Sequence, residues 1–205
     1  MKVTETGVIA MTNQKVDRRI QRTRQLLEDA LIALILEKGY DKITVQNIVD
    51  QANVGRSTFY AHYLDKDELM EKSVELMMEE FGSHFLSSND GDAQEVMIPS
   101  LALFRHTQTH PQLYKAMLGG GAIEIVIKAI RDGLIDHARA YFEREERAGK
   151  RLGVPMEILT THLAGSLLTL LIWWLDNDMP YPPEQMNEMF MQLVRGGIKT
   201  VVEDR

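Results

Sequence analysis

The side chains best suited to chemistry lie together between positions 44 and 66, in the run TVQNIVDQANVGRSTFYAHYLDK. Within this run, residues 56–63 carry a guanidinium group, two aliphatic hydroxyls, two phenols and an imidazole, and no carboxylate. Groups of this kind bind the base edges and phosphates of duplex DNA, whose major groove admits one α-helix. A helix face that only meets solvent more often carries Glu and Lys, so the stretch predicts contact with DNA.

Two short helices joined by a tight turn must position these groups. Apolar residues recur at helical spacing before the turn, and Thr44, which precedes them, suits the N-cap position. The turn falls at residues 52–55, where Gly55 can adopt a backbone shape that is costly for other residues. A second helix is predicted to begin near Arg56. The apolar face of the first helix consists of Val45, Ile48, Val49 and Ala52.

The segment resembles the DNA-binding domain of the tetracycline-repressor (TetR) family. The resemblance is strong from about Arg18 to Met78, and beyond it the family shares an all-helical shape but little sequence. It implies a ligand-responsive transcriptional repressor that binds a palindromic operator as a homodimer. The motifs that carry the resemblance are Glu37-Lys38-Gly39-Tyr40, Ile43-Thr44-Val45, Ala52-Asn53-Val54, Ser57-Thr58-Phe59-Tyr60-Ala61-His62-Tyr63 and Asp65-Lys66-Asp67-Glu68-Leu69.

The resemblance also implies roles for individual side chains in this segment. Thr44 and Lys66 are expected to bind phosphate at helix N-termini, where backbone N–H groups add to the anion site. Phe59 is expected to lie in the core rather than against DNA. The remaining candidates for phosphate contact are Tyr60, His62 and Tyr63. The candidates for base-edge contact are Arg56, Ser57 and Thr58.

The charge of the chain is distributed unevenly. Its net charge is −7 at pH 7, but residues 1–66 carry 10 Lys or Arg against 8 Asp or Glu, whereas residues 67–205 carry 13 against 22. Local clustering, rather than total charge, is what meets phosphate. A basic run can also be a solvated helix start, but beside the helix pair a DNA-facing arm is favoured. The basic cluster comprises Lys15, Arg18, Arg19, Arg22 and Arg24.

Hydrophobic periodicity predicts an all-α chain of about nine helices. We expect a disordered arm over residues 1–15, a helix-turn-helix head over 16–64, and a helical ligand-binding and dimerisation domain over 65–205. A capping box, Asp65-x-x-Glu68, is expected to start the helix that leaves the head, and no strand is predicted. Besides the helix pair, the predicted helices span residues 17–38, 65–85, 94–106, 111–118, 122–147, 156–176 and 183–202.

The last two predicted helices carry more apolar surface than one helical face needs. Gly165-Ser166 and Gly196-Gly197 are small enough to permit close approach between helices. Such a pair can bury its excess apolar surface against a copy of itself, which gives a two-fold four-helix interface. We therefore expect a homodimer through the last two helices, with burial inside the same chain as the alternative.

The helical domain is larger than dimerisation requires, which favours a second role. We expect a small apolar or amphipathic ligand among the middle helices, in a pocket of aromatic and Met side chains with a few polar groups. The alternative is a DNA-tethered adaptor that binds a protein partner; an exposed groove would favour it, and a closed cavity would favour a ligand. The candidate ligand-binding residues are Phe104, Met117, Phe142, His162 and Trp173.

Metal sites and catalysis find little support in the sequence. The absence of Cys excludes thiolate chemistry. His106 and His110 have the spacing of a two-His metal site, but no Glu stands beside them and Pro111 predicts a helix junction, so we predict no metal and no cofactor. Gly119-Gly120-Gly121 lacks the strand and Lys of a phosphate-binding loop. An enzyme is not predicted, although a cluster of strongly shifted ionisable groups in the cavity would indicate one.

The sequence also predicts where the protein resides. No N-terminal apolar run resembles a signal peptide. The most apolar stretch, Leu163–Leu175, is shorter than the about 20 residues that cross a bilayer. We therefore expect a cytoplasmic protein that does not enter a membrane.

Overall fold

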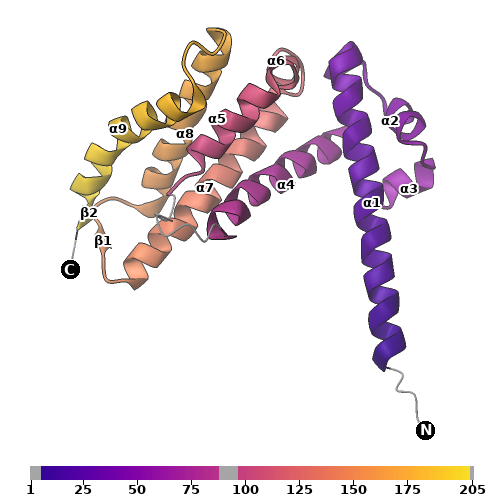
Figure 1. Cartoon of the computed structure of the whole chain (residues 1–205), viewed down its shortest axis with the longest axis horizontal. Coiled ribbons are helices and arrows are strands. Elements are labelled where there is room, and N and C mark those ends of the chain that lie inside the picture. The colour runs from indigo at the N-terminus through magenta and orange to yellow at the C-terminus, as the bar shows by residue number, and fades with distance from the viewer. Residues whose placement is uncertain (1–5, 88–96, 204–205) are drawn as a thin grey trace.

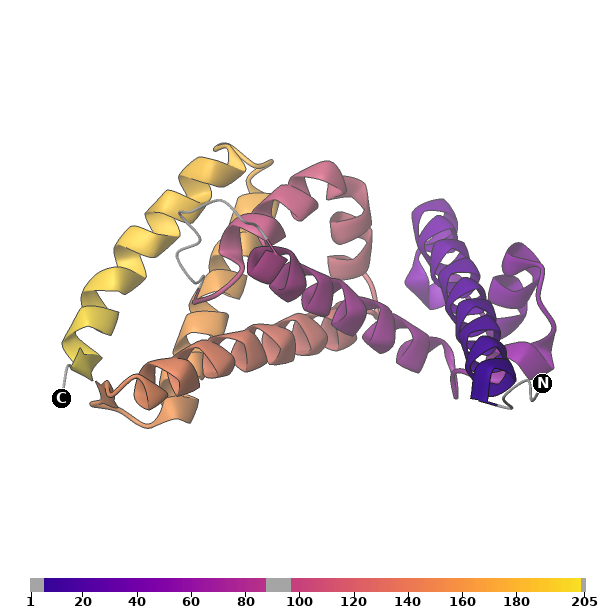
Figure 2. The ribbon, with the colours of Figure 1, turned by 60° about the horizontal axis from the view of Figure 1, so that its bottom comes forward.

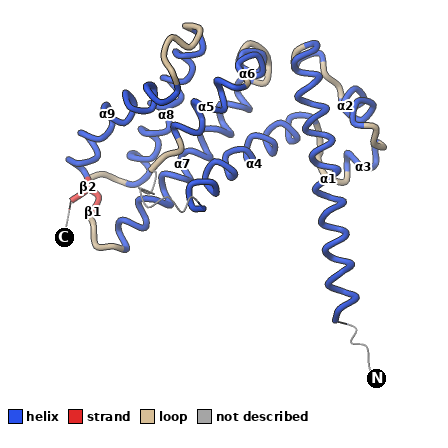
Figure 3. Tube along the Cα trace, viewed as in Figure 1, coloured by secondary structure: helices blue, strands red, loops and turns tan. Residues whose placement is uncertain are grey.

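Helices dominate the computed structural model, which describes residues 6–87 and 97–203 (Figure 1). The all-α prediction with about nine helices is confirmed, and Figure 3 shows how little of the trace is strand. Within the described residues the helices are α1 (Thr6–Lys38), the 3-10 helix η1 (Tyr40–Lys42), α2 (Val45–Ala52), α3 (Arg56–Tyr60), α4 (Lys66–Ser87), α5 (Ser100–Thr109), α6 (Pro111–Leu118), α7 (Ile123–Arg147), α8 (Met156–Asp176) and α9 (Pro183–Val201).

The head, made of α1, α2 and α3, lies at one end of the molecule (Figure 2). Leu27 and Leu31 of α1, Ile48 of α2 and Phe59 of α3 are all buried to 1% exposure or less. Burial of such apolar surface is the main force that holds three short elements together, at about 25 cal/mol per Å². The predicted place of Phe59 in the core is therefore confirmed.

The first helix begins earlier than its sequence predicts. The expected arm over residues 1–15 is helical from Thr6, so that prediction is wrong for residues 6–15, and residues 1–5 lie outside the described part. Ala10, Met11 and Lys15 all favour helix, so this segment extends the helix that the apolar stripe begins further on.

The turn between α2 and α3 lies where the sequence predicts it, but a different residue makes it. Asn53 has the left-handed backbone shape, with φ of 52° and ψ of 47°, and its N–H is bonded to the Val49 and Asp50 carbonyl oxygens. Gly55 has φ of −76° and ψ of 150°, an extended shape open to any residue. The short polar side chain of Asn tolerates the left-handed region, so the predicted special role of Gly55 is wrong.

The predicted capping box at the start of α4 is shifted by one residue. Oδ1 of Asp65 accepts hydrogen bonds from the backbone N–H groups of Asp67 and Glu68, both at 2.9 Å. Oε2 of Glu68 accepts from the N–H of Leu64 at 2.6 Å rather than from Asp65 itself. These bonds satisfy the otherwise unpaired donors of the helix start and fix the point where α4 leaves the head.

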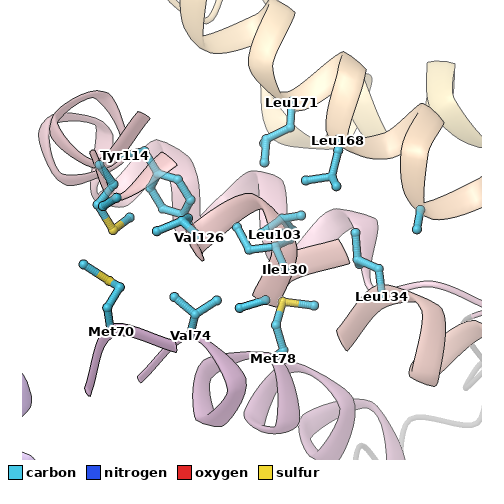
Figure 4. Packing of buried hydrophobic residues seen from close by; sticks show 14 of the residues in the cluster. Met70, Val74, Met78, Leu103, Tyr114, Val126, Ile130, Leu134, Leu168 and Leu171 are labelled. Carbon is cyan, nitrogen blue, oxygen red and sulfur yellow. The ribbon is translucent and has the colours of Figure 1, made fainter. Parts of the chain in front are cut away.

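The larger domain is built around α7. It packs against α4 on one side and α8 on the other, while α5 packs against α9 (Figure 1). In the interior, Leu103 of α5 and Leu134 of α7 meet Leu168 of α8, and all three are buried (Figure 4). Because α4 belongs to this packing and also begins at the head, a movement of α4 against α7 would move the head.

The helix α8 is apolar on more than one face. Its 21 residues have a mean hydropathy of 1.6 over their most apolar window, enough by length and composition to cross a membrane. The predicted apolar stretch thus lies within a longer helix. Half of that window is nevertheless buried inside the protein, as expected for the core helix of a folded domain.

Two short strands, β1 (Arg151–Leu152) and β2 (Val202–Glu203), form an antiparallel pair. The prediction of no strand is wrong at these four positions. The pairing arises because the connection between α7 and α8 runs beside the end of α9, where the Gly153 N–H donates to the Val201 carbonyl oxygen at 2.6 Å.

Candidate nucleic-acid interface and ligand cavity

A capping box and a buried face hold α2 in place beneath the candidate interface. The Asn47 N–H donates to Oγ1 of Thr44 at 3.2 Å, and the Thr44 N–H donates to Oδ1 of Asn47 at 3.0 Å. Ile48, Val49 and Ala52 face the core. The hydroxyl of Thr44 thus caps the start of α2, while the residue itself remains exposed at the N-terminus of that helix.

The helix α3 is anchored on one face and open on the other. Phe59 is fully buried, and its ring meets the Tyr60 ring edge-on at 5.4 Å between centroids. Tyr60 is 54% exposed, and Arg56 and Ser57 are also exposed. The structure therefore exposes three of the predicted contact residues on α3, while Thr58 and His62 are half-buried.

Tyr63 does not belong to that surface. It is only 4% exposed, and its ring packs against Phe59 with 5.9 Å between centroids. Burial is the first cause that raises the pKa of its hydroxyl, which has no hydrogen-bond partner among the described residues. Its predicted contact with phosphate is therefore wrong in this structure: the ring lies four residues after Phe59, on the same buried face.

Lys66 fastens the start of α4 to η1. Its Nζ donates to the Tyr40 carbonyl oxygen at 3.0 Å and lies 4.1 Å from the centroid of the Tyr40 ring. The Tyr40 hydroxyl in turn donates to Oδ1 of Asp67. A cation over an aromatic face is attracted by the ring quadrupole, so this contact orders the junction. The predicted phosphate contact of Lys66 stays a prediction.

The predicted basic arm lies on α1. Arg18, Arg19, Arg22 and Arg24 are all exposed there. Guanidinium groups on an open helix suit phosphate, because the interaction depends on charge and not on a preformed pocket. Lys15 also lies on this helix, but its side chain is outside the described part.

The five predicted ligand-binding residues do not form one site. Phe104 is fully buried against Trp174, with 5.3 Å between ring centroids, and Phe142 is fully buried beside Tyr141. His162 and Trp173 lie instead on the exposed side of α8. Of the five residues, Met117 alone lines the cavity described next. The single-pocket prediction is wrong because the direction in which α8 side chains point depends on packing that spacing alone does not define.

A cavity of about 370 Å³, open to solvent beside the exposed residues Gln25, Ile32 and Glu80, lies where α1 and α4 meet α6 and α7. Met70 and Val74 of α4 face Tyr114 of α6 and Val126 of α7 across this region (Figure 4). The cavity is thus lined jointly by the head and by the larger domain. A few polar groups reach it among the apolar ones: Gln25, Glu28, Ser73, Glu80, His106, His110 and Tyr114.

Burial is the main cause of the shifted pKa values among the ionisable groups of this cavity. It lowers the pKa of His106 to about 4, with His110 as a second cause, and raises the pKa of Tyr114 to about 12. Nδ1 of His106 and the Tyr114 hydroxyl are hydrogen-bonded at 3.0 Å. Burial also raises the pKa of Glu28, whose Oε1 has no hydrogen-bond partner in the described part of the chain.

Burial is the first cause of all three shifts, and the partners of the His106 ring are Tyr114 and the neighbouring His110. Among the side chains that the structure describes, over residues 18–81 and 97–202, no three His, Asp or Glu are grouped to hold a metal ion. His110 instead ends α5 and precedes Pro111 of α6, which is the junction that the sequence predicts.

Sequence reasoning missed Glu28 as a cavity residue. A signal was present, because this carboxylate falls one turn before Leu31 and Ile32 and two turns before Ile35, inside the apolar stripe of α1. A charged residue within such a stripe is rarely fully buried unless it is paired. Which partner helix would meet that stripe was not readable from spacing.

Two family models match the chain. Residues 27–72 match the model of bacterial regulatory proteins of the tetR family, and residues 99–196 match a transcriptional regulator C-terminal region. The TetR transcriptional regulator from Streptococcus agalactiae has a similar structure, with a TM-score of 0.61 and 24% identity, over 89% of this chain and 98% of that chain. Head and helical domain therefore both have counterparts.

Curated relatives give the same direction. The uncharacterized HTH-type transcriptional regulator YxbF of Bacillus subtilis is 24% identical over 185 residues, which are 88% of this chain and 47% of that protein. The negative transcriptional regulator of the icaADBC biofilm operon, IcaR of Staphylococcus epidermidis, is 37% identical over 62 residues, 30% of this chain and 34% of that protein. The chain thus covers about half of the first relative and a third of the second.

Proposed function

Because this chain belongs to the TetR family of transcriptional regulators, we propose that its head binds duplex DNA and that it represses transcription. One observation carries the DNA-binding proposal: α3 presents Arg56, Ser57 and Tyr60 to solvent while Phe59 anchors it from beneath. A short helix anchored in this way can enter the major groove without unfolding the head. Repression is supported by the likeness of 62 residues of this chain to IcaR, a negative regulator.

The test of DNA binding uses an operator selected from random duplexes and measured by fluorescence anisotropy. Arg56→Ala is expected to weaken binding by about ten- to a hundredfold, the loss for one good base contact. Tyr60→Ala is expected to weaken binding to all sequences alike, because phosphate contacts position without specifying. The control is Arg131→Ala, which removes the same charge from α7. Equal affinities for all four proteins would refute the interface.

We also propose that the protein is a homodimer joined through α8 and α9 on a palindromic operator. Ile158 and Trp173 of α8 and Leu193 of α9 are 62%, 43% and 72% exposed, although all are large and apolar. Shallow hollows of about 460 and 230 Å³ lie between these two helices. A second copy of the same face would cover this surface symmetrically. DNA binding also supports a cytoplasmic location.

A small-molecule ligand in the cavity between α1, α4, α6 and α7 is proposed to release the operator. The heads of a two-fold dimer meet successive major grooves only when they are about 34–36 Å apart. The cavity touches both α1 of the head and α7 of the larger domain, so a ligand there can favour a head position with a different spacing. It must bind that form more tightly, since equal affinity for both forms shifts nothing.

A protein-binding adaptor remains the second candidate. The open hollows between α8 and α9 favour it, because an exposed apolar groove can also receive a partner segment. The two candidates differ in solution: the repressor is a dimer without other proteins, whereas the adaptor leaves this face free until its partner binds.

A further inference from the structure

One carboxylate at the cavity has a buried oxygen without a hydrogen-bond partner among the described residues. Oε1 of Glu28 is buried and accepts no hydrogen bond from any described residue. Besides burial, Asp29 and Glu80 raise the pKa of this group, and Arg24 one turn earlier lowers it. A buried oxygen without a donor costs free energy comparable to a lost hydrogen bond, so such groups in folded proteins usually have a partner.

The rest of the cavity lining provides no cation. Among the described residues that line it there is no Lys and no Arg, whereas Glu28 and Glu80 are acidic. His106 adds no charge near neutral pH, because burial lowers its pKa to about 4. Most of the remaining lining is apolar, as at Met70 and Val126. The cavity therefore combines a mostly apolar lining with the carboxylate of Glu28, whose Oε1 has no hydrogen-bond partner among the described residues.

We propose that this cavity binds an organic cation with an apolar body and an N–H donor at one end, and that Glu28 accepts the hydrogen bond from that end. This inference rests on the ligand-dependent release proposed above and names the chemical class of the ligand. The apolar body removes water from the Met and Val side chains, and the charged donor makes a charge-assisted bond to the carboxylate. Because Glu28 belongs to α1, the cation contacts the head directly.

Three probes with one apolar body test the class of ligand. Phenylbutylguanidinium carries the cationic donor, phenylbutanol is neutral, and phenylbutanoate is an anion. Titration calorimetry on the full chain is expected to rank the guanidinium above the alcohol by about ten- to a hundredfold, with the carboxylate weakest. An alcohol that binds as tightly as the guanidinium would overturn the proposal.

Two amide variants on α1 locate the contact. Glu28→Gln keeps the shape of the side chain and removes its charge, so the preference for the guanidinium over the alcohol should disappear. Glu37→Gln is the matched control, because Glu37 is an exposed glutamate on the same helix and does not line the cavity. It should keep the preference. A preference that survives in Glu28→Gln would show that the cation binds elsewhere.

Operator affinity measured with the same probes separates this inference from the function on which it rests. A Glu28-dependent preference without any loss of operator affinity would uphold the cation site and refute its coupling to DNA release. Release of the operator by phenylbutanol or phenylbutanoate, with no preference for the guanidinium, would refute the cation site and uphold ligand-dependent release.

Discussion

The pKa values of the ionisable side chains at the cavity are shifted by burial more than by neighbouring charges. His106 and Tyr114 share one hydrogen bond. Burial lowers the pKa of His106 and raises the pKa of Tyr114, and both shifts favour the neutral side chain. A neutral imidazole and phenol suit a cavity that must stay mostly apolar. Glu28 is the exception, since its carboxylate keeps an unpartnered oxygen there.

The shifted pKa of His106 predicts a loss of stability in acid. Its folded-state pKa of about 4 lies below the ordinary 6.5, so the stabilisation is present above pH 6.5 and is lost as the pH falls toward 4. His106→Gln, which does not titrate, should therefore lose less free energy of unfolding between pH 7 and pH 4.5 than the parent. Urea unfolding across this range measures the difference. Parallel pH profiles for the two proteins would contradict it.

The roles of single residues could be predicted only in part. The family motif implies a core position for Phe59 and a DNA contact for Tyr60, and the structure buries Phe59 and exposes Tyr60. Tyr63 was assigned to DNA from its family motif, although its position four residues later puts it beside Phe59. Glu28 was missed because its environment is made by α4, α6 and α7, far away in sequence.

Among the helices, one contact ties the head directly to the loop between α6 and α7. Oδ1 of Asp41 accepts from the Gly121 N–H at 3.0 Å, and Oδ2 lies 3.3 Å from the same nitrogen. A Cβ added at Gly121 would lie 2.2 Å from Oδ1 of Asp41, so any larger residue there must displace this carboxylate. The contact thus depends on Gly for space.

A double-mutant cycle tests this contact. Asp41→Ala and Gly121→Ala should each lower the free energy of unfolding by about 0.5–1.5 kcal/mol, the net value of a hydrogen bond. The double variant should lose less than the two losses added together, because both changes remove one interaction. Gly120→Ala is the control, since its Cβ would lie at an ordinary 3.5 Å from its nearest atom, Oδ2 of Asp41, and would not displace that carboxylate. Fully additive losses would exclude the proposed coupling.

The bounds of the helices were predictable where the sequence marks them. Pro111 and Pro183 occupy first-turn positions, so α6 and the start of α9 appear as predicted. The start of α1 was not predictable, because residues 6–15 lack an apolar stripe. The pairing of β1 with β2 also escaped prediction, since it depends on where α9 ends in space.

On the scale of the whole molecule, α8 and α9 leave an apolar surface that a dimer would cover. Leu193→Glu is expected to produce a monomer, because a charge buried in an apolar interface without a partner is costly. Leu36→Glu on α1, at a position that is 52% exposed, is the control and should stay dimeric. Sedimentation velocity at micromolar concentration measures both. A dimeric Leu193→Glu protein would place the interface elsewhere.

The prediction of a single ligand pocket is wrong because the apolar faces of α8 point in more than one direction. His162 and Trp173 lie on the face of α8 that a partner copy would cover, and neither is a lining residue of the cavity. Periodicity identified α8 as apolar on several sides, but could not divide those sides between the core and a second chain.

Site-directed cleavage of the operator tests most directly whether α3 binds DNA in a two-fold dimer. The chain contains no Cys, so Leu64→Cys beside α3, at a position that is 79% exposed, can carry a single iron–EDTA group. Glu146→Cys at the end of α7 is the control. Two symmetric clusters of cleavage about 10 base pairs apart are expected from position 64, and none from position 146. Cleavage from position 146 alone, or a single unsymmetric cluster from position 64, would contradict it.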